Sequence, residues 1–229
     1  MKLPLNLKRA SFIERVNRFA ALVCLEGSEV LAHVPNSGRL RELFTPEQTV
    51  YLAPRLGSHR KTAYDLCLVE LGKTLVSCDA RLPSPVVEEA LRLGKLAPFR
   101  GYSTIEREVT FGESRLDLML SGPQGCCFIE AKSITLVEGD AALFPDAPTT
   151  RGTRHVRSLA EAVGQGHRAA VVLVVQRDDA SYFTPYEEAD PQFASVLGEA
   201  AALGVEVYAY GCRVSLTEVV LARELPVHL

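Results

Sequence analysis

The stretch Ile105–Leu136, which reads IEREVTFGESRLDLMLSGPQGCCFIEAKSITL, decides the fold of the second half of the chain. It contains three short runs in which apolar and polar residues alternate, and a period of two is typical of β-strands. The segment Ser121–Gly125 separates the last two runs and consists of residue types that favour a tight turn. The stretch therefore predicts three strands, with a hairpin between the second and the third.

Three charged side chains interrupt these apolar strands. Glu130 and Lys132 lie two residues apart, so a strand places them on the same face. Asp117 lies on the other strand of the hairpin and meets them if the register allows. Two carboxylates and an ammonium are costly to bury unpaired, and a divalent cation held by the carboxylates would remove that cost. Mg²⁺ prefers one or two carboxylates with water and a phosphate oxygen, and Lys132 would then orient or activate the water that attacks a phosphodiester.

The spacing of Asp117 before Glu130-x-Lys132 resembles the motif of the PD-(D/E)xK nuclease superfamily. The same residues also fit a solvated sheet face with an ordinary Glu–Lys pair, because this short pattern arises often by chance. The strand–turn–strand context favours the nuclease-like interpretation.

The composition provides enough apolar residues for a hydrophobic core, and the chain as a whole is not basic. The 229 residues are 47% hydrophobic, which suffices for one large domain or two small ones. The net charge is −3, yet residues 1–61 carry +5 and the remainder −8. A basic N-terminal part fits a partner with a phosphate backbone, and a solvated surface of mixed charge fits the count equally well.

The cysteines and the apolar runs bear on location. The six cysteines include no CxxC pair and lie mostly in apolar runs, so we expect free thiols in a reducing compartment. No apolar run approaches 18 residues, and the N-terminus lacks the apolar region of a signal peptide. These features predict a cytoplasmic protein without a membrane partner.

Residues 1–82 contain about five short strand-like runs with turns between them, which predicts an OB-like β-barrel. OB barrels bind nucleic acids through basic and aromatic side chains on one face. The candidates for that face, each of which also has an ordinary interpretation as a surface arginine or a core phenylalanine, are Arg15, Arg18, Phe19, Arg39 and Arg41. The segment Arg81–Pro85 contains two prolines and is the expected linker.

Residues 83–229 follow the order helix, three strands, helix, strand, helix, strand, which predicts a mixed sheet with helices packed on it. The PD-(D/E)xK core has the same order. The first helix carries Glu88 and Glu89, which are either solvated or the source of a third carboxylate for a metal site. A long irregular loop is expected over Glu138–Thr153, followed by a helix over Arg154–Val163. Arg151 and His155 are candidates to reach a scissile phosphate, although a lone histidine beside a helix start is more often structural.

With these features in view, the sequence resembles the sugar fermentation stimulation protein A family from end to end. The matching segments include RVNRF at 15–19, HVPNSG at 33–38, SRLD at 114–117, EAK at 130–132, FPDA at 144–147 and GHRA at 166–169. The chain departs from the usual family pattern mildly at Val34, Ser37 and Ala131. It also has Thr150 where the family usually has Glu, which argues against a metal or phosphate role for that position.

The resemblance implies an α/β protein in which an OB-like barrel, residues 1–82, precedes a PD-(D/E)xK nuclease-like domain, residues 83–229. It implies DNA binding linked to the regulation of sugar (maltose) use. The family pattern places an acid at Glu89 rather than at its neighbour. The nuclease-like site implied by the resemblance consists of Glu89, Asp117, Glu130 and Lys132, with the Ala131 carbonyl as a further ligand of Mg²⁺ or Mn²⁺ beside Asp117 and Glu130.

Two main functions follow from the sequence. The first is a divalent-metal-dependent nuclease, and the second is a non-catalytic, largely non-specific DNA-binding regulator; a third, an interaction module whose charged cluster pairs internally, ranks last. RNA or single strands as substrates, and a homodimer, remain open. The residues expected to contact nucleic acid are Arg15, Arg18, Arg39, Arg115, Arg151 and His155.

Overall fold

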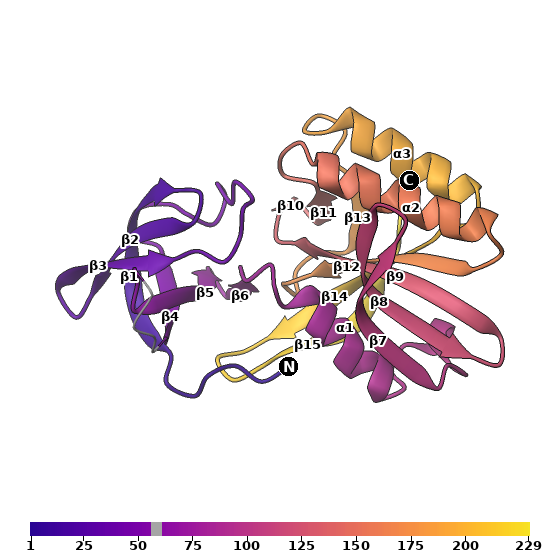
Figure 1. Ribbon diagram of the computed structural model, residues 1–229. Coiled ribbons are helices and arrows are strands. Elements are labelled where there is room, and N and C mark those ends of the chain that lie inside the picture. The colour runs from indigo at the N-terminus through magenta and orange to yellow at the C-terminus, as the bar shows by residue number, and fades with distance from the viewer. Residues whose placement is uncertain (56–60) are drawn as a thin grey trace.

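The structure is a computed structural model that describes residues 1–55 and 61–229. A small β-barrel lies beside a larger sheet that carries helices on both faces (Figure 1). Arg60, which contributes to the basic charge of the N-terminal part, lies outside the described residues.

The barrel consists of strands paired in the order β3-β2-β1-β4-β5-β6, and an additional pairing of β3 with β5 closes it. Buried apolar side chains such as Phe12, Val23 and Leu52 fill its interior. Six strands are present where about five were expected, because the chain reverses at Arg18-Phe19 and makes two strands of one long extended segment. The strands are β1 (Lys8–Asn17), β2 (Ala20–Leu25), β3 (Ser28–His33), β4 (Thr49–Pro54), β5 (Tyr64–Leu71) and β6 (Thr74–Ser77).

The larger sheet has the order β15-β14-β12-β9-β8-β7. The central strand β12 runs parallel to β9 and β14, whereas the β7–β8, β8–β9 and β14–β15 pairs are antiparallel, so the expected mixed sheet is confirmed. The three strands expected from the opening stretch are β7, β8 and β9, with the turn between the last two. The strands are β7 (Thr104–Phe111), β8 (Ser114–Gly122), β9 (Gly125–Ile134), β12 (Arg168–Val175), β14 (Glu206–Val214) and β15 (Val219–Leu225).

Helices cover both faces of this sheet (Figure 1). One face packs against α1 (Pro83–Arg92) and the 3₁₀ turn η1 (Ala97–Phe99), and the other packs against α2 (Thr150–Gly164) and α3 (Pro191–Ala202). Alternate residues of β12 belong to the two cores, which explains why its sequence is an unbroken apolar run. Among the described residues, no helix has the length and apolar character needed to cross a membrane.

The expectation of an irregular loop over Glu138–Thr153 is wrong in part. Strands β10 (Val137–Glu138) and β11 (Ala141–Phe144) occupy its first half and form a small sheet with β13 (Tyr182–Pro185). Helix α2 already begins at Thr150. Thr149 caps that helix, because its hydroxyl oxygen accepts a hydrogen bond from the Gly152 amide at 3.1 Å. The pairing of β11 with β13 joins residues 41 positions apart, as in Ala141 with Tyr182, so a local pattern does not reveal it.

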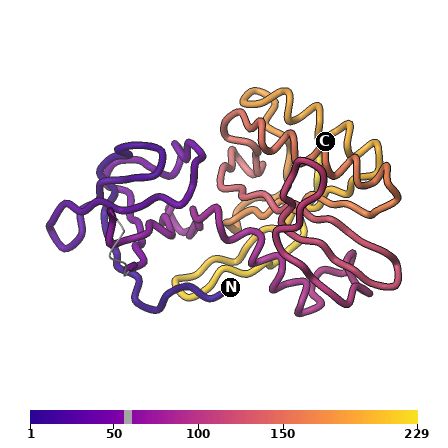
Figure 2. The backbone as a smooth tube through the Cα atoms, viewed as in Figure 1, coloured from indigo at the N-terminus to yellow at the C-terminus, as the bar shows by residue number. Residues whose placement is uncertain are grey.

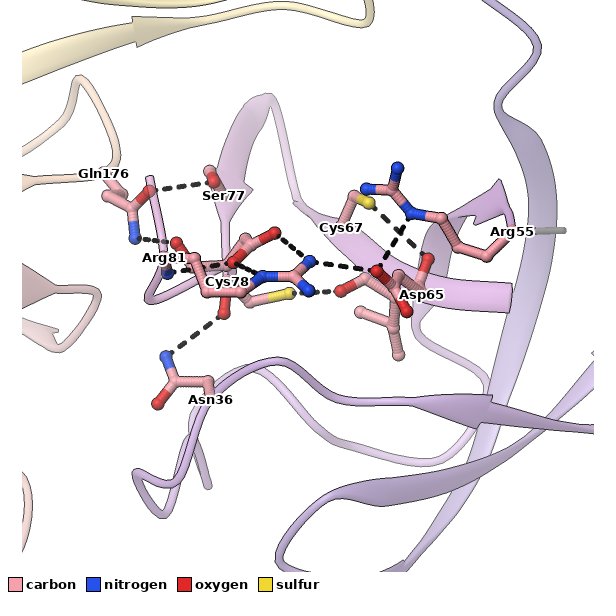
Figure 3. Close-up of polar contacts among 10 residues, drawn as sticks. Asn36, Arg55, Asp65, Cys67, Ser77, Cys78, Arg81 and Gln176 are labelled. Carbon is pink, nitrogen blue, oxygen red and sulfur yellow. Dashed lines mark hydrogen bonds and ion pairs between the residues drawn. The ribbon is translucent and has the colours of Figure 1, made fainter. Parts of the chain in front are cut away.

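Buried polar contacts join the barrel to the larger sheet. Gln176, at the end of β12, accepts a hydrogen bond from the Ser77 hydroxyl at 3.0 Å and donates to the Asp79 carbonyl at 3.2 Å (Figure 3). Arg81 continues the network, because its guanidinium bonds both Asp79 and the fully buried Asp65. The junction between the two parts is therefore hydrogen-bonded in the manner of a protein interior.

The first residues of the chain lie against its last strands (Figure 2). Lys2 pairs with Glu218 in an isolated bridge, and the Leu3 amide donates to the Thr217 carbonyl at 2.8 Å. The six cysteines are free thiols, four of them buried and two half-buried.

Candidate active site

Strands β8 and β9 bring the two carboxylates of the opening stretch together. Along β9 the side chains alternate between the two cores, with Phe128 on the α2 face and Ile129 on the α1 face, so Glu130 and Lys132 point toward α2. On β8, the Asp117 carboxylate accepts a hydrogen bond from the Ala131 amide at 2.8 Å. The predicted convergence of these three charged side chains is therefore present.

Glu130 lies at the centre of the cluster, with a side chain that is 5% exposed. Its Oε1 accepts hydrogen bonds from Lys132 Nζ and from His155 Nδ1, both at 2.6 Å. Because an ionised carboxylate only accepts, Nδ1 of His155 carries a proton, and Nε2 of a neutral ring can accept from Arg151 Nε at 3.4 Å. The other oxygen, Glu130 Oε2, is buried and has no hydrogen-bond partner within residues 1–55 and 61–229.

The two carboxyl groups have opposite electrostatic environments. Burial, followed by repulsion from Glu130, raises the pKa of Asp117 to about 6, against weaker stabilisation by the Ala131 amide and Lys132. Burial also acts to raise the pKa of Glu130, but the charge of Lys132 and the hydrogen bonds from His155 and Lys132 together hold that pKa below its ordinary value. Glu130 is thus a fixed negative charge, and Asp117 carries its charge less favourably.

A cavity of about 410 Å³ opens above this cluster, between the barrel and the larger sheet. We call it the seam cavity. Its floor is formed by the charged residues of β8 and β9, and its walls come from the barrel and from the segment that precedes α2. The residues that line it include Asp117, Glu130, Lys132, Arg18, Ser37, Gly38, Asp146 and Arg151.

The predicted basic contacts divide into two groups. Arg18 and Arg151 line the seam cavity and are exposed. Arg15 instead donates to backbone carbonyls of residues 18, 36, 38 and 39, so it holds the barrel loop in place. Arg115 forms an exposed ion pair with Glu108.

Other predicted site residues take different places. Glu89 lies on α1, its carboxylate bonds the amino group of Met1, and it is not part of the seam cavity. His155 is 2% exposed and bonds Glu130 rather than facing solvent. Arg39 takes part through its backbone amide, which donates to Asp146 Oδ2 at 2.6 Å.

Asp146 is the residue of this region that the site prediction did not include. Its Oδ2 accepts from the amides of Arg39 and Leu40, at 2.6 and 3.2 Å, across the seam between the two parts of the chain. The available signals were a lone acid in the segment between β11 and α2 and its place in the family-like segment FPDA at 144–147. Sequence position alone does not show that such an acid meets a loop more than a hundred residues earlier.

The candidate metal ligands near Glu130 are oxygen atoms rather than nitrogen or sulfur atoms. In the described part of the chain, no group of three or more His, Cys, Asp or Glu side chains is arranged as a ready metal centre. Two carboxylates, Asp117 and Glu130, remain, and Ala131, whose amide donates to Asp117, lines the same cavity.

Family models match both parts of the chain. Residues 81–218 match the family model described as "Sugar fermentation stimulation protein RE domain", and residues 13–78 match the one described as "SfsA N-terminal OB domain". The chain belongs to the sugar fermentation stimulation protein family. The predicted fold, an OB-like barrel followed by a mixed-sheet α/β domain, is confirmed, as is the predicted family.

Members of the family are similar over the full length. A curated "Sugar fermentation stimulation protein homolog" of Moorella thermoacetica is 47% identical, with 100% of both chains covered. The corresponding homolog of Desulforamulus reducens is 45% identical over 98% of this chain and 93% of its own length. Among solved structures, "Pyrococcus Furiosus SfsA in complex with Ca2+" has a TM-score of 0.92 at 36% identity, with 100% of both chains covered.

Proposed function

We propose that this chain binds DNA and hydrolyses phosphodiester bonds with a divalent cation, Mg²⁺ or Mn²⁺, held by Asp117 and Glu130. Glu130 Oε2 is the atom that carries the proposal, because it is buried and lacks a partner among the described residues. Burying a carboxylate oxygen without a partner lowers the stability of the fold, and a cation beside that oxygen removes this unfavourable free energy. Asp117 supports the same conclusion, since burial, and then repulsion from Glu130 beside it, raises its pKa to about 6.

The chemistry of the donors fits a hard cation. Carboxylate and carbonyl oxygens are the ligands that Mg²⁺, Mn²⁺ and Ca²⁺ take in proteins, usually with water and, for Mg²⁺, phosphate oxygens. Asp117, Glu130 and the Ala131 carbonyl would hold the ion. The relative from Pyrococcus furiosus was solved in complex with Ca²⁺, which supports a divalent cation in this family member too.

The residues around the carboxylates have distinct proposed roles. A cation bound there would polarise the phosphate and lower the pKa of water at the site. Lys132, whose Nζ lies 2.6 Å from Glu130 Oε1, would position the attacking water. Arg18 and Arg151 would bind non-bridging phosphate oxygens at the wall of the seam cavity. Water supplies the oxygen that bonds phosphorus, the ester P–O bond breaks, and the leaving oxygen takes a proton.

Glu89 is not part of the proposed site. Its carboxylate is engaged by the Met1 amino group, and it does not line the seam cavity. The proposal therefore rests on two carboxylates rather than on the three that the family resemblance implies.

The test is cleavage of labelled DNA, single- and double-stranded, by the purified full chain with Mg²⁺ or Mn²⁺ and then with chelator. We expect cleavage that depends on the metal and is lost in Asp117→Ala and Lys132→Ala. Glu113→Gln, an exposed acid in the turn between β7 and β8, is the matched control and should keep full activity. DNA binding that survives both site substitutions, with no cleavage by the unmodified chain, would instead support a regulator of sugar metabolism that binds without turnover.

A further inference from the structure

The barrel forms one wall of the seam cavity. Arg18, in the turn between β1 and β2, and the loop formed by residues 36–40 line the cavity opposite Glu130 and Lys132. A substrate that reaches the carboxylates must therefore pass between the barrel and the larger sheet. Substrate access is limited by both parts of the chain and not by the larger sheet alone.

That wall is held in a fixed position. Asp146 accepts hydrogen bonds from two amides of the 36–40 loop, and Arg15 donates to several of its carbonyls. Asn36, which is buried, also donates to the Cys78 carbonyl at 3.1 Å (Figure 3). Gly38 lies so close to Asp146 that a Cβ atom there would come within 2.6 Å of Oδ2. Widening the cavity requires breaking these contacts, so its present size is relevant to what it accepts.

An exposed aromatic side chain follows Arg18, a residue of this wall, in the sequence. Phe19 follows Arg18 in the β1–β2 turn, is 49% exposed, and stacks on the His33 ring at a centroid distance of 6.4 Å and an interplanar angle of 28°. A single exposed apolar residue is common on protein surfaces. This one, however, lies directly beside an arginine that lines the cavity, and an aromatic face next to a cation is the arrangement that binds unpaired nucleic-acid strands.

The size of the cavity favours an unpaired strand over a duplex. A volume of about 410 Å³ is within the range that holds one drug-sized molecule, which is the scale of a single nucleotide. Double-stranded DNA, with a major groove alone about 12 Å wide, does not enter such a space. Enzymes that act inside small pockets on duplex DNA must first take a nucleotide out of the stack.

We propose that the seam cavity takes an unpaired strand. Phe19 stacks on a base outside the cavity, Arg18 binds the adjoining phosphate at the wall, and the following phosphate reaches Asp117 and Glu130. This inference rests on the proposed function for the last of these contacts, whereas the contacts of Phe19 and Arg18 can be tested by binding alone.

The experiment measures fluorescence anisotropy of the full chain in Ca²⁺ with two probes: a labelled oligothymidylate of about 12 nucleotides, a length within the range of one OB-type barrel, and a duplex of equal length. We expect the single strand to bind at least about tenfold more tightly than the duplex at equal salt. Phe19→Ala should weaken single-strand binding by about tenfold, the effect of losing one base stack, and change duplex binding by less than about twofold.

Leu203→Ala is the matched control, because Leu203 is 66% exposed and lies just after α3. It should alter neither affinity, and thermal unfolding of both variants should match that of the unmodified chain.

Equal affinity for the two probes, no binding of either, or an equal effect of Phe19→Ala on both would overturn the inference. Metal-dependent cleavage of duplex DNA alone would overturn it while leaving the proposed function intact. Preferential strand binding without any cleavage would refute the nuclease and leave the strand contacts standing.

Discussion

Asp117 carries its charge in an environment that opposes it. Burial and the neighbouring Glu130 raise its pKa to about 6, and the Ala131 amide and Lys132 compensate only in part. A chain selected for stability alone would place a neutral residue there, and sites that violate such local rules are commonly functional. The unfavourable charge is therefore consistent with a cation as the missing partner.

Asp117→Asn should stabilise the metal-free protein at alkaline pH. A carboxyl whose pKa is about 6 when folded and 3.8 in the reference state destabilises the fold when ionised, and this penalty fades as pH falls from 6 toward 4. With allowance for partial solvent access, we expect a gain of roughly 1–3 kcal/mol in the free energy of unfolding at pH 8, and almost none at pH 4. Denaturant unfolding with chelator at the two pH values measures it, and a loss of stability at pH 8 would contradict the electrostatic account.

His155 should act through Glu130. Its Nδ1 donates to Oε1, and Oε2 has no hydrogen-bond partner among the described residues. Loss of such a supporting hydrogen bond typically weakens metal binding about 10- to 100-fold. We therefore expect His155→Ala to weaken Mn²⁺ affinity by that factor, measured by calorimetry.

Ser158→Ala separates this effect from general damage to α2. Ser158 is buried on the same helix and donates to the Ser114 hydroxyl at 2.8 Å, away from the seam cavity. Its substitution should lower stability while leaving Mn²⁺ affinity within about twofold, since a neutral hydrogen bond contributes about 1 kcal/mol to folding. Equal losses of Mn²⁺ affinity in the two variants would show that His155 supports the helix and not the carboxylate.

At the scale of elements, alternation in the sequence was sufficient to predict the hairpin of β8 and β9. The period of two fixed which residues share a face, so Glu130 and Lys132 could be placed together before the structure was known. The sequence predicts a loop as far as Thr153, whereas α2 begins at Thr150. Gly152 and the threonines are poor helix formers, so the sequence does not reveal the capped first turn. The family resemblance places Glu89 at the site, and the sequence does not show that the Met1 amino group reaches its carboxylate.

Asp146 should hold the 36–40 loop against the larger sheet. Asp146→Ala removes the acceptor of the Arg39 and Leu40 amides, and hydrogen bonds to a charged acceptor are worth about 1.5–3 kcal/mol each. We expect faster hydrogen exchange at these two amides, with β8 and β9 unaffected. Asp140→Ala, an exposed acid between β10 and β11, is the control and should leave exchange in the loop unchanged. Unaltered protection of the two amides in Asp146→Ala would mean that Arg15 and Asn36 hold the loop without Asp146.

At the scale of the whole molecule, the junction between the barrel and the larger sheet is as important for the site as the barrel or the sheet itself. The seam cavity exists because the barrel docks on the larger sheet, and the hydrogen bonds of Asp146 with the Arg39 amide and of Gln176 with Ser77 join residues far apart in sequence. This is why composition and motifs could predict the two folds and the carboxylates but not the shared cavity. Docking geometry depends on long-range contacts that leave no periodic pattern in the sequence.

Gln176→Leu should weaken that docking. The substitution leaves the Ser77 hydroxyl, the Asp79 carbonyl and the Ser133 hydroxyl without their partner, at a combined cost of about 2–4 kcal/mol. We expect a lower unfolding midpoint and separation of the transition into two steps, measured by calorimetry and by fluorescence. Gln165→Leu, at the exposed end of α2, should leave a single transition. A single, unshifted transition in Gln176→Leu would show that other contacts dominate the junction.

The most direct test of the central claim is calorimetric titration of the chelator-treated full chain with Mn²⁺ at pH 8, without nucleic acid. We expect one site per chain in the unmodified protein and in Glu89→Gln and Glu113→Gln. Glu130→Gln and Asp117→Asn should each weaken binding at least about 100-fold, because each removes a charged ligand from a two-carboxylate site. Undiminished binding in these two variants, or no binding by the unmodified chain, would contradict the assignment of Asp117 and Glu130 as the cation ligands.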